Sequence, residues 1–132
     1  MERLKQRADF LAAARGTETS APAFVLQARV RADAGPARIG FTVAKKVGNA
    51  VERNRVRRRL REMVRASAVA AQPGHDYVVI GRRAALGLPF ARLLADFEHA
   101  MRHLQAKAAR RRPQSAEIER NPRPAAEDES PR

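Results

Sequence analysis

Two segments of the chain alternate between apolar and polar residues with a period of two, which is the pattern of half-buried β-strands. The segments are FVLQARVR at 24–31 and RIGFTVA at 38–44. The intervening ADAGPA is rich in turn-forming residues, so we expect the two strands to pair as a hairpin. A third strand is predicted at DYVVIG, 76–81, after a turn formed by Pro73 and Gly74.

Three other segments have helical periodicity. RADFLAAAR at 7–15 predicts a short helix. FARLLADFEHAMRHL at 90–104 places its large apolar residues within about 100° of the helix circumference, so this stripe should face the core. A further helix should begin near Ala50, because Asn49 and Glu52 have the spacing of a capping box. The order of helix, strands, helix, strand and helix predicts an α+β sandwich.

The helix that should begin near Ala50 lies in the most basic part of the chain. Residues 45–65 contain nine Lys or Arg but only two acids, Glu52 and Glu62. A narrow apolar arc that would anchor this helix on a sheet consists of Val56, Leu60, Met63 and Val64. A second, polar face consists of Asn54, Arg57, Arg58, Arg61 and Arg65, with Arg55 and Arg59 further round. Arg53, in the first turn, is expected to reach back toward Lys45 and Lys46.

A run of charge is usually a solvated helix face, but three features favour polyanion binding here. A solvated face interleaves acids at i to i+4 spacing, and in this helix Glu62 can serve only Arg58 or Arg59. Seven of the nine cations are arginine, whose planar guanidinium binds phosphate through two hydrogen bonds. The Gly48-Asn49 turn also offers backbone amides to a phosphate oxygen. We therefore expect nucleic acid as the partner.

The composition of the whole chain agrees with that expectation. Its 132 residues suffice for one domain, and 27 basic against 14 acidic residues give a net charge of +13. No run of residues approaches the ~18 apolar residues of a membrane span, and the N-terminus does not resemble a signal peptide, so we expect a cytoplasmic protein. The absence of cysteine excludes disulfides and thiol chemistry.

The last part of the chain has a different composition. Residues 111–132 contain four prolines, one branched aliphatic residue and no aromatic residue, which is too little apolar surface for independent order. We interpret residues 111–132 as a disordered tail and residues 1–110 as the folded domain. Because five arginines of the tail offset its five acids, the folded domain carries the whole net charge of +13.

Residues 45–55 resemble the signature of the protein subunit of bacterial ribonuclease P, which runs Lys-Lys-x-Gly-Asn-Ala-Val-x-Arg-Asn-Arg. The matching residues are Lys45, Lys46, Gly48, Asn49, Ala50, Val51, Arg53, Asn54 and Arg55. The resemblance extends over roughly residues 3–105. Within that range RLKQRADF is similar to the family's opening segment, FVL to its first long strand, RIGFTVA to the strand before the signature and DYVVIGRR to the strand after it.

The resemblance implies a fold, a function and a set of partners. The fold would be α-β-β-β-α-β-α with a mixed sheet, in which the basic helix joins two parallel strands by a left-handed crossover. Residues 1–110 would be the RNA-binding domain of an endoribonuclease that removes the 5′ leader of precursor tRNA. The partners would be the catalytic RNA of ribonuclease P and precursor tRNA, with neither DNA nor a membrane. Catalysis is expected in the RNA, with Mg²⁺ acting mainly through the RNA.

The resemblance and the helix pattern together predict two sets of binding residues. Contacts with the catalytic RNA are expected at Lys45, Lys46, Asn49, Arg53, Asn54, Arg55, Arg57, Arg58, Arg61 and Arg65. Leader contacts, in a cleft between the sheet and the first helix, are expected at Phe10, Gln27, Arg29 and Arg31. The family usually has aromatic residues at the positions of Ala14 and Gln27, so base stacking here should be weaker or rearranged. Phe10 can equally be interpreted as a core residue beneath the first helix.

Acid–base catalysis by the polypeptide itself would depend on His75, His99 and His103. His99 and His103 have the i to i+4 spacing of a metal site, but no third ligand is apparent nearby. No catalytic residue is therefore assigned to the chain. Two other classes of protein are also small and basic: a ribosomal protein, which the signature argues against, and a DNA-binding helix module. The latter needs base-reading residues on one narrow edge, whereas arginine covers more of this helix.

Overall fold

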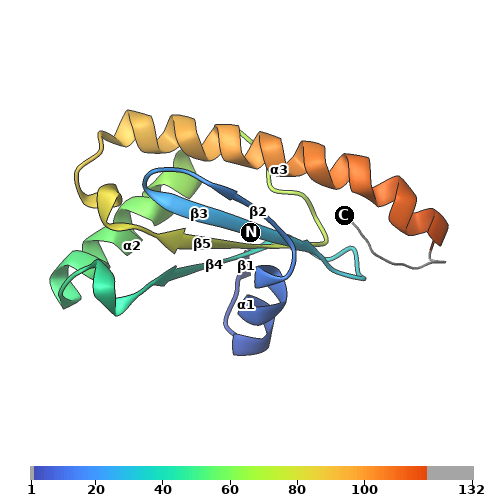
Figure 1. Cartoon of the computed structure of the whole chain (residues 1–132), viewed down its shortest axis with the longest axis horizontal. Helices are drawn as coiled ribbons and strands as arrows, with labels where there is room; N and C mark the ends of the chain where they lie inside the picture. The colour runs from blue at the N-terminus through green and yellow to red at the C-terminus, as the bar shows by residue number, and fades with distance from the viewer. Residues whose placement is uncertain (1, 119–132) are drawn as a thin grey trace.

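A five-stranded mixed sheet with three α-helices forms the protein (Figure 1). The computed structural model describes residues 2–118, with side chains as far as Lys107. The strands are β1 (Glu2–Arg3), β2 (Thr17–Ser20), β3 (Phe24–Val30), β4 (Arg38–Val43) and β5 (His75–Gly81). The helices are α1 (Arg7–Ala14), α2 (Ala50–Ala66) and α3 (Phe90–Ile118), with short 3-10 helices η1 (Lys45–Val47) and η2 (Arg83–Leu86). The expected α-β-β-β-α-β-α order is confirmed, with the short β1 added in front.

The predicted hairpin between residues 24–31 and 38–44 is wrong. The strand order is β1-β4-β5-β3-β2, so β5 lies between β3 and β4, antiparallel to β3 and parallel to β4. The reason lies in the composition of β5, where Tyr77, Val78 and Val79 are consecutive and almost completely buried. A strand with apolar residues on both sides requires cover on both faces, so it takes the centre of the sheet and separates β3 from β4.

Both edge strands lack a strand signal in the sequence. β2 consists of Thr, Glu, Thr and Ser, and β1 is two residues long. β2 forms by antiparallel pairing with β3, and β1 by parallel pairing with β4 at Arg38 and Ile39. β1 depends on a strand that is distant in the sequence, and β2, although it pairs with the next strand, has no apolar residue that could alternate with polar ones, so local periodicity predicts neither strand.

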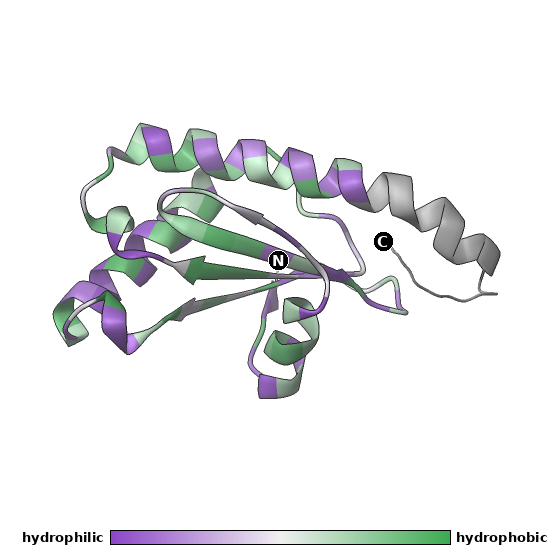
Figure 2. Cartoon of the chain, viewed as in Figure 1, coloured by the Kyte–Doolittle hydropathy of each residue, from purple (hydrophilic) through white to green (hydrophobic). Residues whose placement is uncertain are grey.

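The helices cover the two faces of the sheet unequally (Figures 1 and 2). α2 and α3 pack on one face, where the rings of Phe24 and Phe97 meet edge to face with centroids 6.2 Å apart. α1 packs on the opposite face, where Leu4, Ala13 and Val78 form a separate buried cluster. Since α1 is only 8 residues long, part of this second face carries no helix.

The predicted apolar stripe of α3 is confirmed from Leu93 onward, whereas its first member, Phe90, is 36% exposed and Leu94 is half-buried. Its fully buried members are Leu93, Phe97, Met101 and Leu104. The helix continues to Ile118, past position 111 where composition predicts the tail to begin. Residues 105–112 are all strong helix formers, whereas no local signal accounts for the helix beyond Pro113. The rest of the predicted tail, residues 119–132, lies outside the described residues. Over residues 2–118, none of the helices has the length and apolar character needed to cross a membrane.

Candidate nucleic-acid interface

α2 is held in place by its apolar side and by its N-terminal cap. Val56, Leu60 and Met63 are completely buried, as the apolar arc predicts. The predicted capping box is also present. Asn49 Oδ1 accepts the backbone N–H of Glu52 at 2.9 Å, and Glu52 Oε1 accepts the backbone N–H of Asn49 at 3.0 Å. The polar side of α2 is therefore fixed facing away from the core.

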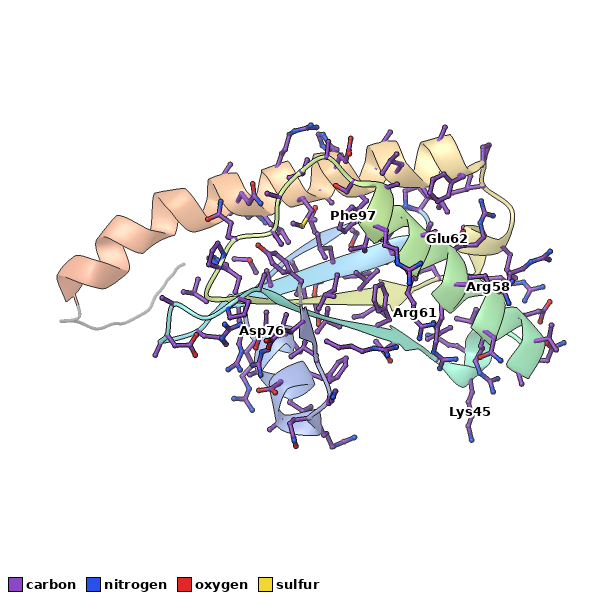
Figure 3. The ribbon with its side chains drawn as sticks, turned by 180° about the vertical axis from the view of Figure 1, so that it is seen from behind. Lys45, Arg58, Arg61, Glu62, Asp76 and Phe97 are labelled. Carbon is purple, nitrogen blue, oxygen red and sulfur yellow. The ribbon has the colours of Figure 1, made fainter. Side chains whose placement is uncertain are left out.

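The exposed side of α2 carries cations that no described residue neutralises. Five exposed residues have side chains that form no hydrogen bond or ion pair with any described residue: Lys45, Lys46, Arg55, Arg58 and Arg65. In Figure 3, Arg58 projects from α2 and Lys45 from the loop before it. Glu62, which has the spacing to serve Arg58 or Arg59, forms an ion pair with neither. Unpaired like charges repel one another, so this surface is suited to a polyanion.

Other arginines of α2 are engaged within the protein. Arg53 reaches back to the preceding loop as predicted, where its Nη1 donates to the Gly48 carbonyl at 2.7 Å. Arg57 Nη1 donates to Asn54 Oδ1 at 3.1 Å. Arg59 donates at 2.7–3.2 Å to three backbone carbonyls, those of Ala85, Leu86 and Leu88. Arg59 therefore ties α2 to η2 and does not extend the free basic surface.

Arg83 supports the loop before α2, although no pattern in the sequence assigns it that role. Its Nη1 donates to the Val47 carbonyl at 2.7 Å, and its Nη2 contacts Glu52 Oε2 at 3.2 Å. Hydrogen bonds from the Asn49 backbone and from Arg83 lower the pKa of Glu52. A Cβ at position 48 would overlap Glu52 Oε1, so a larger residue there would push the Glu52 carboxylate away from the Asn49 backbone N–H. The position of Arg83 follows only from the topology of the sheet. The parallel strands β4 and β5 end on the same side of the sheet, so η1 and η2, which follow them, lie close together.

A second charged cluster surrounds Asp76, at the opposite end of β4 and β5 (Figure 3). Asp76 is completely buried and accepts four guanidinium hydrogen bonds. Arg38 donates through Nε and Nη2 at 2.8 Å each, Arg31 through Nη1 at 2.6 Å, and Arg29 through Nε at 3.0 Å. Arg29 Nη2 also donates to Asp9 Oδ1 at 3.0 Å. One buried carboxylate thus connects α1, β3, β4 and β5.

The arginines around Asp76 determine its protonation state. Burial by itself raises the pKa of Asp76, but hydrogen bonds from Arg38, Arg31 and Arg29 outweigh burial and lower the pKa to about 2. In turn, the hydrogen bond to Asp76 raises the pKa of Arg38. The three arginine charges are offset by three carboxylates, those of Asp9, Asp33 and Asp76. This end of the sheet is therefore an internally balanced network, unlike the surface of α2.

Three of the predicted leader-contacting residues lie on β3 or directly after it, and two of them are buried. Gln27 is 8% exposed, and its Nε2 donates to Glu18 Oε1 at 3.2 Å. The side chain of Arg31 is also 8% exposed and is held by Asp76. The side chain of Arg29 keeps 28% of its surface exposed. Leader binding by these residues stays a prediction, with Arg29 the most accessible of the three.

Phe10, the fourth predicted leader residue, is half-buried beneath α1. Its ring occupies the space that a side chain at position 40 would take, because a Cβ on Gly40 would overlap the ring. Phe10 therefore packs against the cluster of Leu4, Ala13 and Val78 without joining the buried core, and its contact with the leader stays a prediction. The ring still contributes to the surface beside α1, and Ala14 on the same helix is exposed.

The three histidines lie on two different elements, His75 on β5 and His99 with His103 on α3. His75 begins β5, is 4% exposed, and stacks on Tyr77 with ring centroids 6.0 Å apart. His99 and His103 are exposed on α3, with nearly parallel rings 6.5 Å apart. Nowhere in the described part of the chain do three His, Asp or Glu side chains gather so that they could hold a metal ion.

Comparison with known proteins identifies the family of this chain. A family model described as Ribonuclease P matches residues 1–105. The chain is 52% identical over 110 residues to the ribonuclease P protein component of Gluconacetobacter diazotrophicus, covering 81% of this chain and 94% of that protein. It is 50% identical over 108 residues to the protein of the same name from Ruegeria pomeroyi, covering 78% and 86%.

The fold agrees with that identification. The RNase P protein from Thermotoga maritima superposes with a TM-score of 0.66 at 28% identity, covering 78% of this chain and 97% of that one. Its counterpart from Staphylococcus aureus superposes with a TM-score of 0.63 at 30% identity, covering 77% and 94%. The capped basic helix, the mixed sheet and these similarities lead to one conclusion: the chain belongs to the ribonuclease P protein component family, whose members form a ribonucleoprotein endonuclease together with RNA.

Proposed function

We propose that the chain binds the RNA of ribonuclease P through the exposed cations of α2 and of the loop before it. The observation that carries this proposal is the set of unpartnered cations on a helix whose orientation is fixed by buried residues and a capping box. RNA phosphates would neutralise these charges and release condensed counterions, which favours binding. Arg59, in contrast, contributes through the fold, since it donates to backbone carbonyls.

The face of the sheet beside α1 is the proposed site of the 5′ leader of precursor tRNA. α1 covers only part of that face, and the half-buried Phe10 ring lies at its margin. Arg29 adds a partly exposed guanidinium on β3. Because Gln27 is buried against Glu18, leader contacts would come mainly from Phe10 and Arg29, through stacking and phosphate binding.

Cleavage itself is proposed to occur in the RNA. Phosphodiester hydrolysis needs a positioned nucleophile and stabilisation of developing charge, which RNA-bound Mg²⁺ supplies. The described residues offer no set of ligands that fits a resident Mg²⁺, so the metal ions would be held mainly by RNA phosphates. The cytoplasmic location predicted from the sequence stays a prediction.

Salt-dependent binding tests the proposed RNA interface. Lys45→Ala, Arg55→Ala, Arg58→Ala and Arg65→Ala should each weaken binding to ribonuclease P RNA. Each should also reduce the slope of log affinity against log salt by about one contact. Arg102→Ala removes an equally exposed cation from α3 and should leave the slope unchanged. If all five variants kept the wild-type slope of log affinity against log salt, the proposed surface would be rejected.

Cleavage assays test where catalysis occurs. The RNA-free polypeptide should leave precursor tRNA intact, and the reconstituted complex should cleave it. The His99→Ala/His103→Ala variant removes the two exposed histidines and should cleave at nearly the wild-type rate after reconstitution. Cleavage at the mature 5′ end by the RNA-free polypeptide, lost in the histidine variant, would show a protein active site instead.

A further inference from the structure

Arg61 differs from the other half-buried arginines of α2 because its guanidinium has no polar partner in the described part of the chain. Arg53, Arg57 and Arg59 each donate hydrogen bonds to oxygen atoms of the protein. Arg61 forms no hydrogen bond or ion pair with any described residue, and its Nε is both shielded from solvent and unsatisfied. A buried N–H group without an acceptor is unfavourable. The two terminal nitrogens of Arg61 are not buried and also have no acceptor among the described residues, so they are free to donate to an acceptor from outside the described chain.

The guanidinium of Arg61 lies over an aromatic ring from the sheet. Arg61 Cζ is 6.0 Å from the centroid of the Phe41 ring, which is near the outer limit of a cation–π contact. Phe41 belongs to β4 and is half-buried against the core that α2 covers. β1 pairs with β4 only at Arg38 and Ile39, so in the described chain no strand lies beside Phe41 on that edge. The Phe41 ring and the Arg61 guanidinium therefore lie next to each other at an unpaired edge of β4.

The surroundings of Arg61 favour an anion with several oxygen atoms. Arg57, Arg58 and Arg65 share its helix face, within about 60° of it at 100° per residue. Glu62, the neighbouring acid, is exposed and pairs with none of these arginines. In Figure 3, Arg58, Arg61 and Glu62 all lie on α2, on the side remote from Asp76. A guanidinium held over a ring presents its donors in one plane, which matches two oxygens of a phosphate group.

We propose that Phe41 and Arg61 form a phosphate-binding subsite of the RNA interface, in which the Phe41 ring is a positioning residue for the Arg61 guanidinium. This inference rests on the proposed function and adds to it a residue of β4 that lies outside the basic helix. The ligand is a phosphodiester group of RNA. Both ribonuclease P RNA and precursor tRNA supply that group, so the experiment must distinguish them.

A double-mutant cycle in the full-length protein tests the subsite. The variants are Phe41→Leu, Phe41→Tyr, Arg61→Gln and the Phe41→Leu/Arg61→Gln double variant. Affinity is measured over a range of salt, first for ribonuclease P RNA alone and then for precursor and mature tRNA with the reconstituted complex. The assay in which Arg61→Gln weakens binding identifies the RNA that supplies the phosphate.

The expected results separate positioning from direct binding. Arg61→Gln should weaken binding and reduce the salt slope by about one contact. Phe41→Leu should weaken binding about two- to fivefold while leaving the slope unchanged, and should cause no further loss once Arg61 is replaced. Phe41→Tyr keeps a ring and should bind as the wild type does. Phe90→Leu, which removes a partly exposed ring at the start of α3, should also keep wild-type affinity.

Two results would contradict the proposed subsite. One is that Phe41→Leu binds RNA with wild-type affinity. The other is that replacing Phe41 by Leu lowers the affinity of the Arg61→Gln variant as much as it lowers that of the wild type. If thermal unfolding shows that Phe41→Leu is not folded at the assay temperature, Phe41→Met repeats the test with a side chain closer in volume. Wild-type protein that bound RNA without salt dependence would instead reject the proposed function.

Discussion

Replacing Asp76 by Asn is the most demanding test of the buried charge cluster. Asp76 is completely buried and accepts hydrogen bonds from Arg29, Arg31 and Arg38. Asn has nearly the same shape but no charge, and only one of its two terminal groups accepts hydrogen bonds. The substitution therefore leaves three guanidinium groups close together with fewer acceptors and one less negative charge.

The size of the effect can be estimated in two ways. Removing one partner from a buried ion pair typically costs about 3–5 kcal/mol. Independently, the pKa of Asp76 falls from its ordinary value of 3.8 to about 2, which corresponds to about 2 kcal/mol of stability at neutral pH. The second value omits the repulsion among the arginines that the Asn variant suffers. We therefore expect Asp76→Asn to lower the free energy of unfolding by about 3 kcal/mol.

The same cluster predicts how this loss depends on pH. Because the pKa of Asp76 is lower in the folded protein than in the unfolded chain, its contribution is fully present above the unfolded pKa. It disappears as the pH falls through the folded pKa of about 2. The stability difference between wild type and Asp76→Asn should thus be constant above about pH 5 and should shrink by about 2 kcal/mol toward pH 2.

Urea unfolding followed by far-UV circular dichroism measures this difference at each pH. Asp33→Asn is the matched control, because the side chain of Asp33 is 64% exposed and, among the described residues, contacts one arginine, Arg31, and the Gly35 backbone N–H. It should lose much less stability than Asp76→Asn at every pH. A loss below about 1 kcal/mol for Asp76→Asn at pH 7, or a difference that does not change between pH 5 and pH 2, would refute the reasoning.

Three further predictions concern single side chains. Gly40→Ala should lower stability by about 1–3 kcal/mol in thermal unfolding, because its Cβ would overlap the Phe10 ring; an unchanged melting temperature would contradict that packing. Asn49→Ala should cost about 1 kcal/mol, the usual value of an N-cap, and Asn49→Ser should restore most of it. Arg59→Ala should reduce stability but leave the salt slope of RNA binding unchanged, opposite to Arg58→Ala; the reverse result would exchange the roles assigned to these two arginines.

Local features of the sequence were enough to predict α2 and its basic surface. The capping box of Asn49 and Glu52 spans four residues, and the buried arc of Val56, Leu60 and Met63 repeats with the helix period. Both signals depend only on residues within a few turns of one another. The strand segments of β3, β4 and β5 were predicted for the same reason, since a period of two is also local.

Only the tertiary structure decided how the strands pair and which charges remain free. The hairpin prediction was wrong because β5 inserts between β3 and β4. The short spacing between β3 and β4 in the sequence cannot show that a strand further along the chain will lie between them. Arg58 and Arg59 are the same residue at neighbouring positions of α2. The Arg59 guanidinium nevertheless donates to backbone carbonyls of η2, whereas the Arg58 guanidinium reaches no acceptor in the described chain. A helical wheel gives the direction of a side chain. Its hydrogen-bond partners come from segments brought together by folding, so they follow from the topology of the sheet.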